Sequence, residues 1–305
     1  MERVRAAVTG RRPDRPPFCF WHHFRPRGSA ANLAHATLDF FGDFDLDIYK
    51  IMPDIPYPFP SGSIKTADDW RLISPLDPSS GNLGAMVDCV RLVRRQLSDR
   101  APILLTMFSP FTYAARFAGV DNIRDQLEQN PTELHAGLAV LAANLARFAR
   151  ASIDAGADGI FFACQGGADS LLSRAEYGEF ARPYDIQVLQ AAQHGWLTTL
   201  HAHGNADLFT DDFARYPAAV LSWSDRITGV SLLEMRRKAL SAVLMGGIRE
   251  NGAILAGDRD ALRAEMRDAI EQTGGEKFIL ANGCSVPDDI PPANLRMARD
   301  LVDRL

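Results

Sequence analysis

Residues 131–164 read PTELHAGLAVLAANLARFARASIDAGADGIFFAC and contain one complete helix-to-strand unit. From Pro131 to Ala155, small and apolar residues recur every three or four positions, which predicts an amphipathic helix. GIFFAC at 159–164 is a short apolar run, which predicts a buried strand. A helix that leads directly into a buried strand is the building unit of a parallel sheet, so this stretch predicts an α/β fold.

The same unit recurs along the chain. Amphipathic stretches such as Arg174 to Gly195 and Pro292 to Leu305 separate short apolar runs. A doubly wound open sheet is the alternative, but no GxGxxG or GxxxxGK(S/T) loop follows an early strand. Because eight runs close a barrel, we predict a single (β/α)8 TIM barrel domain over residues 1–305. The eight runs are FCFW (18–21), LDIYKIM (46–52), PILLTMF (102–108), GIFFAC (159–164), WLTTLHA (196–202), AVLSWS (219–224), AVLMGG (242–247) and KFILANG (277–283).

The composition favours a protein that works on small molecules. The chain is 47% hydrophobic, and 33 Lys and Arg against 38 Asp and Glu leave a net charge of −5, which gives no basic surface for nucleic acid or an anionic membrane. No apolar run has the length of a membrane helix, and MERVRAAVTGRRPDRPP lacks the apolar segment of a signal peptide. The four cysteines form no CxxC pair, so we expect reduced thiols. These features predict a cytoplasmic protein.

In a (β/α)8 barrel the active site lies at the C-terminal ends of the strands, so the polar residues that follow each run are the candidates. The seventh run ends in Gly246 and Gly247, which either let a substrate approach the backbone or form a tight turn. The Pro- and Ser-rich segment PDIPYPFPSGS (53–63) opens a long insertion, which predicts a lid or a wall of the site. The candidates are His22, His23, Arg25, Arg27, Tyr49, Lys50, Asp54, Ser109, Gln165, His201, His203, Asn205, Trp223, Ser224, Asp225, Asn282 and Cys284.

Two histidines and a cysteine in this set suggest a metal site. His201 and His203 lie two residues apart at the end of LTTLHAHG, so they share one face of a strand. Cys284 follows FILANG in the matching position of the last strand. Imidazole and thiolate are ligands that zinc prefers, and three protein ligands with a variable fourth suit a catalytic site. The alternative is two strand-end histidines bound to backbone and a buried, apolar cysteine.

Asp225 is the candidate for a fourth metal ligand. Its strand adjoins the strand of His201 and His203, and a carboxylate beside zinc is chemically ordinary. Alternatively, Asp225 pairs with Arg226 or caps the next helix. His22 or His23 would then take its place.

These motifs resemble the uroporphyrinogen decarboxylase superfamily, which includes the methylcobamide:coenzyme M methyltransferases and is related in fold to the catalytic half of cobalamin-independent methionine synthase. The likeness rests on RPPFCFW (15–21), AGADGIFFA (155–163), HAHGN (201–205) and NGCSVPDDIPPANL (282–295). In the zinc methyltransferases of the superfamily the ligands are an HxC pair and a late cysteine.

The resemblance implies a ligand set for this chain. His201 matches the family histidine, His203 stands in place of the cysteine, Cys284 matches the late cysteine, and Asp225 falls near the carboxylate of the methionine synthases. Exchanging a thiolate for an imidazole makes the site less negative and the bound Zn²⁺ a stronger Lewis acid.

The decarboxylase pattern of the same superfamily fits less well. Asp54 corresponds to the family aspartate that follows the second strand and faces the pyrroles. The arginine-rich RQAGRY stretch reads WHHFRPRG here, with Arg25 and Arg27 out of step and His22 near the first family arginine.

The leading hypothesis is therefore a zinc-dependent alkyl (methyl) transferase, in which a substrate thiol takes the open metal position and attacks an activated methyl group. The alternative is a decarboxylase or lyase for a carboxylated substrate, in which Arg25, Arg27 and Lys50 bind carboxylates and Asp54 stabilises a cationic intermediate. A third hypothesis is a non-catalytic binding protein. The expected partners are a small-molecule substrate, a corrinoid protein inferred from the resemblance, and a second copy in a homodimer.

Overall fold

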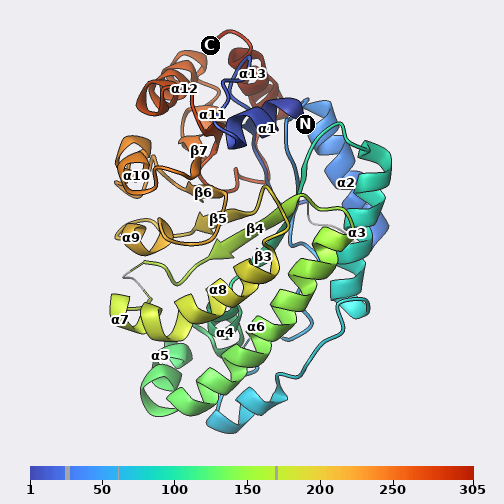
Figure 1. Ribbon diagram of the computed structural model, residues 1–305, viewed down its shortest axis with the longest axis vertical. Coiled ribbons are helices and arrows are strands. Elements are labelled where there is room, and N and C mark those ends of the chain that lie inside the picture. Colours follow the sequence, from blue (N-terminus) through green and yellow to red (C-terminus); the bar gives the residue numbers. More distant parts are fainter. Residues whose placement is uncertain (25–27, 61, 169–170) are drawn as a thin grey trace.

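Eight parallel strands form one sheet in the computed structural model, which describes residues 1–24, 28–60, 62–168 and 171–305. The strands occupy the centre and the helices surround them (Figure 1). All eight apolar runs of the sequence contain a strand, so the predicted (β/α)8 TIM barrel is confirmed. The strands are β1 (Phe18–Cys19), β2 (Tyr49–Ile51), β3 (Ile103–Phe108), β4 (Gly159–Cys164), β5 (Thr199–Ala202), β6 (Val220–Trp223), β7 (Val243–Ile248) and β8 (Phe278–Asn282).

The barrel is nearly closed. Hydrogen-bonded neighbours run in the order β1-β8-β7-β6-β5-β4-β3-β2. Asp47, which precedes β2, bridges the remaining gap: its backbone N–H donates to the Phe18 carbonyl at 3.0 Å, and its carboxylate accepts from the Phe18 N–H at 2.8 Å. These contacts hold the N-terminal ends of β1 and β2 side by side.

The helices fill the outer ring. The predicted helix from Pro131 is observed as the long helix α6, whereas the predicted helix 174–195 divides into three parts because a π-helical turn, Tyr177–Ala181, interrupts it. The helices are α1 (Glu2–Val8), α2 (Ala30–Asp43), η1 (Ala67–Leu72), α3 (Gly81–Leu97), α4 (Pro110–Ala118), α5 (Val120–Gln129), α6 (Pro131–Asp154), α7 (Arg174–Glu176), η2 (Tyr177–Ala181), α8 (Arg182–Ala191), α9 (Thr210–Phe213), α10 (Leu232–Lys238), α11 (Ala253–Ala256), α12 (Arg259–Thr273) and α13 (Pro292–Val302).

Helix α6 is long and apolar enough, by length and composition, to cross a membrane, but half of its apolar window is buried inside the molecule. It packs against α8, η1 and α4. Leu134, Leu138, Leu141 and Leu145 recur on its buried side. This is the pattern of a helix that covers the core of a barrel.

The insertion between β2 and β3 forms a wall. The Gly62 N–H donates to the Arg116 carbonyl at 3.1 Å, and the Ile64 N–H donates to the Phe117 carbonyl at 2.9 Å. Trp70 in η1 is buried, and its indole N–H donates to Gln126 at 3.0 Å. Because these contacts tie the segment to α4 and α5, it holds those helices against the mouth of the barrel.

Candidate active site

A pocket of about 130 Å³ lies at the C-terminal ends of the strands. Its walls come from β2 to β5 and from the segments that follow β1, β2, β4, β5 and β8. Phe161 and Ala163 on β4 alternate with residues that point outward, as expected for a strand that faces the barrel interior. The volume equals roughly four molecules of liquid water, so the pocket suits a small substrate or part of a larger one.

His201 and His203 both line this pocket, as their spacing predicts. The His201 ring stacks on Phe161, with 5.2 Å between ring centroids, and its Nδ1 lies 3.2 Å from the Ser222 hydroxyl. The centroids of the two imidazoles are 6.0 Å apart. Burial lowers the pKa of both histidines, that of His201 well below its usual range. Both rings are therefore neutral at pH 7, the form that ligates metals.

Cys284 lines the same pocket from the segment that follows β8. The chain turns there because Asn282, the last residue of β8, donates its side-chain amide to the Cys284 carbonyl. Burial raises the pKa of the thiol. Cys284 thus remains a thiol at neutral pH unless a cation at the site favours the thiolate.

The imidazoles of His201 and His203 and the thiol of Cys284 are donors of the type that zinc prefers, but they do not converge on one point. As they lie, no three His, Cys, Asp or Glu side chains within residues 1–24, 28–60, 62–168 and 171–305 are arranged to hold a metal ion. Metal binding therefore requires these side chains to rearrange. The roles of His201, His203 and Cys284 as ligands stay predictions.

The carboxylate of Asp225 points away from the pocket. One oxygen accepts from the Gly247 N–H at 2.8 Å, and the other lies 3.3 Å from Arg226 Nε. This is the pairing with Arg226 that the sequence also allowed. A Cβ on Gly246 would come within 2.6 Å of Asp225, and one on Gly247 within 2.6 Å of Ala269, so protein atoms, rather than a substrate, require these two glycines.

Glu250 is an acidic residue that sequence reasoning missed. One of its oxygens accepts from the Ser224 hydroxyl at 2.8 Å, and the other is buried without a hydrogen-bond partner among the described residues. A Cβ on Gly283 would lie 3.1 Å from that second oxygen. β7 extends to Ile248, one residue beyond the apolar run predicted from the sequence, and Glu250 is the first acidic residue after it.

Lys50 on β2 is a buried amine that has no acidic partner among the described residues. Its side-chain nitrogen lies 4.2 Å from the centre of the Phe161 ring, 5.0 Å from that of Trp21, and 3.1 Å from the Met52 sulfur. The two ring faces favour the ammonium. Burial outweighs them and lowers the pKa of Lys50 to about 7.

Arg116 is a second cation of the pocket that the sequence did not single out. It lies on α4, the helix that follows β3, so it is not among the residues at the strand ends. Its guanidinium stacks 3.7 Å from the centre of the Phe108 ring and donates to Gln165 at 3.3 Å. The described residues give it no ion pair. Among the described residues, the pocket lining contains Lys50 and Arg116 but no aspartate or glutamate, so it favours an anionic ligand.

The two histidines that follow β1, His22 and His23, have different surroundings. His23 lines the pocket, and its Nδ1 lies 2.5 Å from Asp54 Oδ1. His22 points elsewhere: its ring packs on Phe40 at 4.5 Å, and its Nδ1 lies 2.6 Å from the His23 carbonyl. The candidates Arg25 and Arg27 lie outside the described residues.

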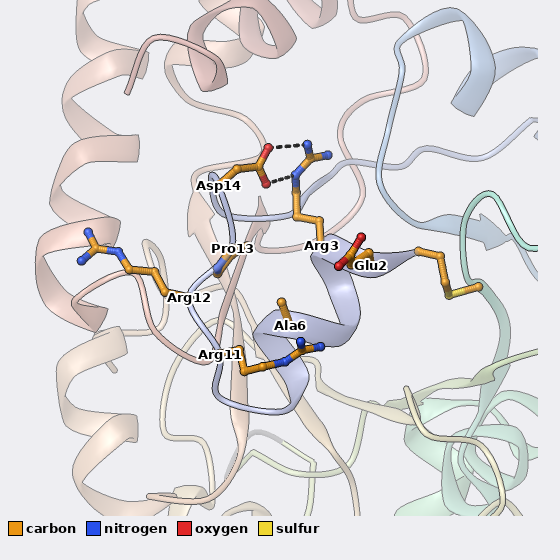
Figure 2. A pocket seen from close by; sticks show the side chains of 8 residues that line it. Glu2, Arg3, Ala6, Arg11, Arg12, Pro13 and Asp14 are labelled. Carbon is orange, nitrogen blue, oxygen red and sulfur yellow. Dashed lines mark hydrogen bonds and ion pairs between the residues drawn. The ribbon is translucent and has the colours of Figure 1, made fainter.

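A larger hollow of about 590 Å³ lies beside α1, at the N-terminal ends of the strands (Figure 2). Arg3 and Asp14 form a two-bonded ion pair across it, with distances of 2.8 and 2.7 Å. Because it lies away from the strand exits, we assign no site to it.

A (β/α)8 barrel whose mouth gathers imidazoles, a thiol and two basic side chains has the architecture of an enzyme for small molecules. Residues 49–305 match the family described as uroporphyrinogen decarboxylase (URO-D). The chain therefore belongs to the uroporphyrinogen decarboxylase family, and the predicted resemblance is confirmed.

Relatives of known name are distant. The uroporphyrinogen decarboxylase of Tolumonas auensis is 26% identical over 244 residues, which cover 75% of this chain and 66% of that protein. That of Syntrophotalea carbinolica is 24% identical over 262 residues, or 82% of this chain and 73% of its own. The chain thus spans about two thirds to three quarters of the length of these relatives.

Solved structures confirm the fold. A methyltransferase from Methanosarcina mazei superposes with a TM-score of 0.80 at 19% identity and covers 99% of this chain and 97% of its own. A B12-independent methionine synthase from a Shewanella species gives a TM-score of 0.62 at 12% identity and covers 90% of this chain and 86% of its own.

Proposed function

We propose that this chain is a zinc-dependent methyltransferase that methylates a small-molecule thiol. The observation that carries the proposal is that His201, His203 and Cys284, which are far apart in sequence, line one pocket at the barrel mouth. Two imidazoles and a thiolate are ligands that Zn²⁺ prefers, and three protein ligands leave a position for a substrate. A separate corrinoid protein is the methyl donor in this proposal.

Zinc at these ligands would supply a Lewis acid that lowers the pKa of the acceptor thiol. The residues of the chain do the rest. Phe161 and Ser222 fix the orientation of His201, as supporting contacts do for metal ligands. Lys50 and Arg116 attract an anionic group of the acceptor, and the aromatic walls exclude water from the reacting sulfur.

The fourth ligand is proposed to be either substrate or a protein carboxylate. Asp225, the residue predicted for this role, would have to leave Gly247 and Arg226. Glu250 has a buried oxygen without a partner among the described residues. If Glu250 contributes, Glu250→Gln weakens zinc binding and Asp225→Asn does not.

Zinc analysis tests the proposal. Protein stripped with a chelator and reloaded should bind about one zinc ion per chain, because three donors line the pocket. Cys284→Ala and His201→Ala should each lower the bound zinc to near zero, since two remaining ligands hold zinc weakly. Methyl transfer from methylcobalamin to a panel of thiols should fall in parallel.

His194→Ala is the matched control, because His194 is exposed and lies outside the pocket. It should retain the full zinc content and activity. Retention of one zinc per chain by both Cys284→Ala and His201→Ala would show that the ligand assignment is wrong.

A decarboxylase is the second candidate, favoured by one observation: Lys50 and Arg116 line the pocket, and no acidic residue is among its described lining. Together they would bind a substrate carboxylate. In that case Arg116→Gln raises the KM for a carboxylated substrate by about tenfold or more, as expected for loss of a charged hydrogen bond. Turnover that a chelator leaves unchanged would favour this candidate over the methyltransferase.

A further inference from the structure

We propose that His23 and Asp54 form an acid–base dyad in which Nε2 of His23 takes the proton of the acceptor thiol. The two residues follow different strands, β1 and β2, and nothing in their sequence spacing pairs them. The inference rests on the proposed methyl transfer to a thiol, and it adds the group that receives the proton.

The hydrogen bonds determine the tautomer of His23. Asp54 Oδ1 lies 2.5 Å from His23 Nδ1, and Asp54 Oδ2 accepts from the Phe24 N–H at 2.8 Å. A carboxylate only accepts, so the shared proton belongs to Nδ1. The lone pair then lies on Nε2, which has no hydrogen-bond partner among residues 1–24, 28–60, 62–168 and 171–305. Nε2 is thus available to take a proton.

The dyad combines a buried carboxylate with a half-exposed imidazole. The Asp54 side chain is only 6% exposed, whereas the His23 side chain is 45% exposed and lines the pocket. Asp54 is therefore held by two contacts behind the ring, and it orients His23 towards the cavity. A buried carboxylate that orients a half-exposed imidazole is the arrangement used by general bases in enzymes.

Among the described residues, Asp288 lies beside the dyad. Asp288, on the segment after β8, accepts from the His23 backbone N–H at 3.3 Å and lies 4.0 Å from His22 Nδ1. Across the pocket, His23 shares the cavity with Lys50, Arg116, His201, His203 and Cys284. Lys50 and Arg116 favour a deprotonated acceptor, whose proton therefore needs a recipient such as Nε2.

The proposed step transfers one proton and one methyl group. The thiol proton moves to His23 Nε2, and the sulfur lone pair forms a bond to the methyl carbon. The bond between that carbon and the donor breaks, and its electron pair stays with the donor. His23 then releases the proton to water.

Thiols of graded acidity test the role of His23. With methylcobalamin as donor, His23→Gln should slow methylation of an alkyl thiol about 100-fold, within the usual range for loss of a general base. It should slow methylation of thiophenol, which is already ionised at pH 8, less than about threefold. His194→Gln is the control, because His194 is exposed and lies outside the pocket, and it should match wild type with both thiols. Added imidazole should restore activity to His23→Ala.

Asp54 acts as a positioning residue, and its test reads the tautomer directly. Long-range ¹H–¹⁵N NMR of wild-type protein should show the Nδ1–H form of His23, and Asp54→Asn should abolish that preference. Equal rates for His23→Gln and wild type with every thiol overturn the dyad while leaving the proposed function intact. A wild-type protein that methylates no thiol overturns the proposed function, whatever the NMR spectrum shows.

Discussion

Lys50→Met should stabilise the protein relative to wild type by on the order of 4 kcal/mol more at pH 7 than at pH 10.5. The ammonium of Lys50 is fully buried, and burial lowers its pKa from 10.5 to about 7. In the unfolded chain the same group keeps its usual pKa. Between pH 7 and pH 10.5 the unfolded state therefore binds more protons than the folded state, so the stability of the wild-type protein rises with pH across this window.

Urea unfolding of both proteins across the window measures this difference. The Met variant lacks the titrating group, so its advantage should shrink steadily as the pH rises. Lys65→Met is the control, because Lys65 is exposed, and its difference from wild type should stay level. A constant difference between Lys50→Met and wild type would mean that Lys50 keeps its charge in the pocket, held by Phe161 and Trp21.

Gly159→Ala should destabilise the barrel by about 3 kcal/mol or more. Gly159 begins β4, and a Cβ there would lie 2.4 Å from the Thr198 backbone nitrogen and 2.6 Å from the Leu197 carbonyl carbon. Neither atom can move without displacing the chain that enters β5. Because β4 and β5 pair Ala163 with His201, the substitution should also disturb the candidate metal ligands.

Thermal and urea unfolding, together with zinc content, measure this effect. Gly178→Ala is the matched control, because Gly178 lies in a helical turn and a Cβ there meets nothing within 4 Å. That control should be neutral or stabilising by up to about 1 kcal/mol. Similar stability of Gly159→Ala and the control would show that the Thr198 and Leu197 backbone leaves room for a methyl group at Gly159.

The barrel itself could be predicted from the chain, since every apolar run contains a strand. Strand formation depends on a local pattern, namely a short apolar run between amphipathic stretches, and the count of such runs limits the fold to a closed ring. The shared face of His201 and His203 follows from the same local geometry, because side chains two apart on a strand point to one side.

The partners of the polar side chains depended on the tertiary structure. One oxygen of Glu250 has no hydrogen-bond partner among the described residues. Asp225 contacts Gly247 and Arg226, and His23 contacts Asp54. Such pairings require two atoms to come within about 3 Å of each other when the strands close into a ring. A local sequence pattern does not specify the distance between residues that are remote in the chain. A period of two residues specifies the side of a strand on which a side chain lies; the neighbour it meets there depends on residues that are remote in the chain.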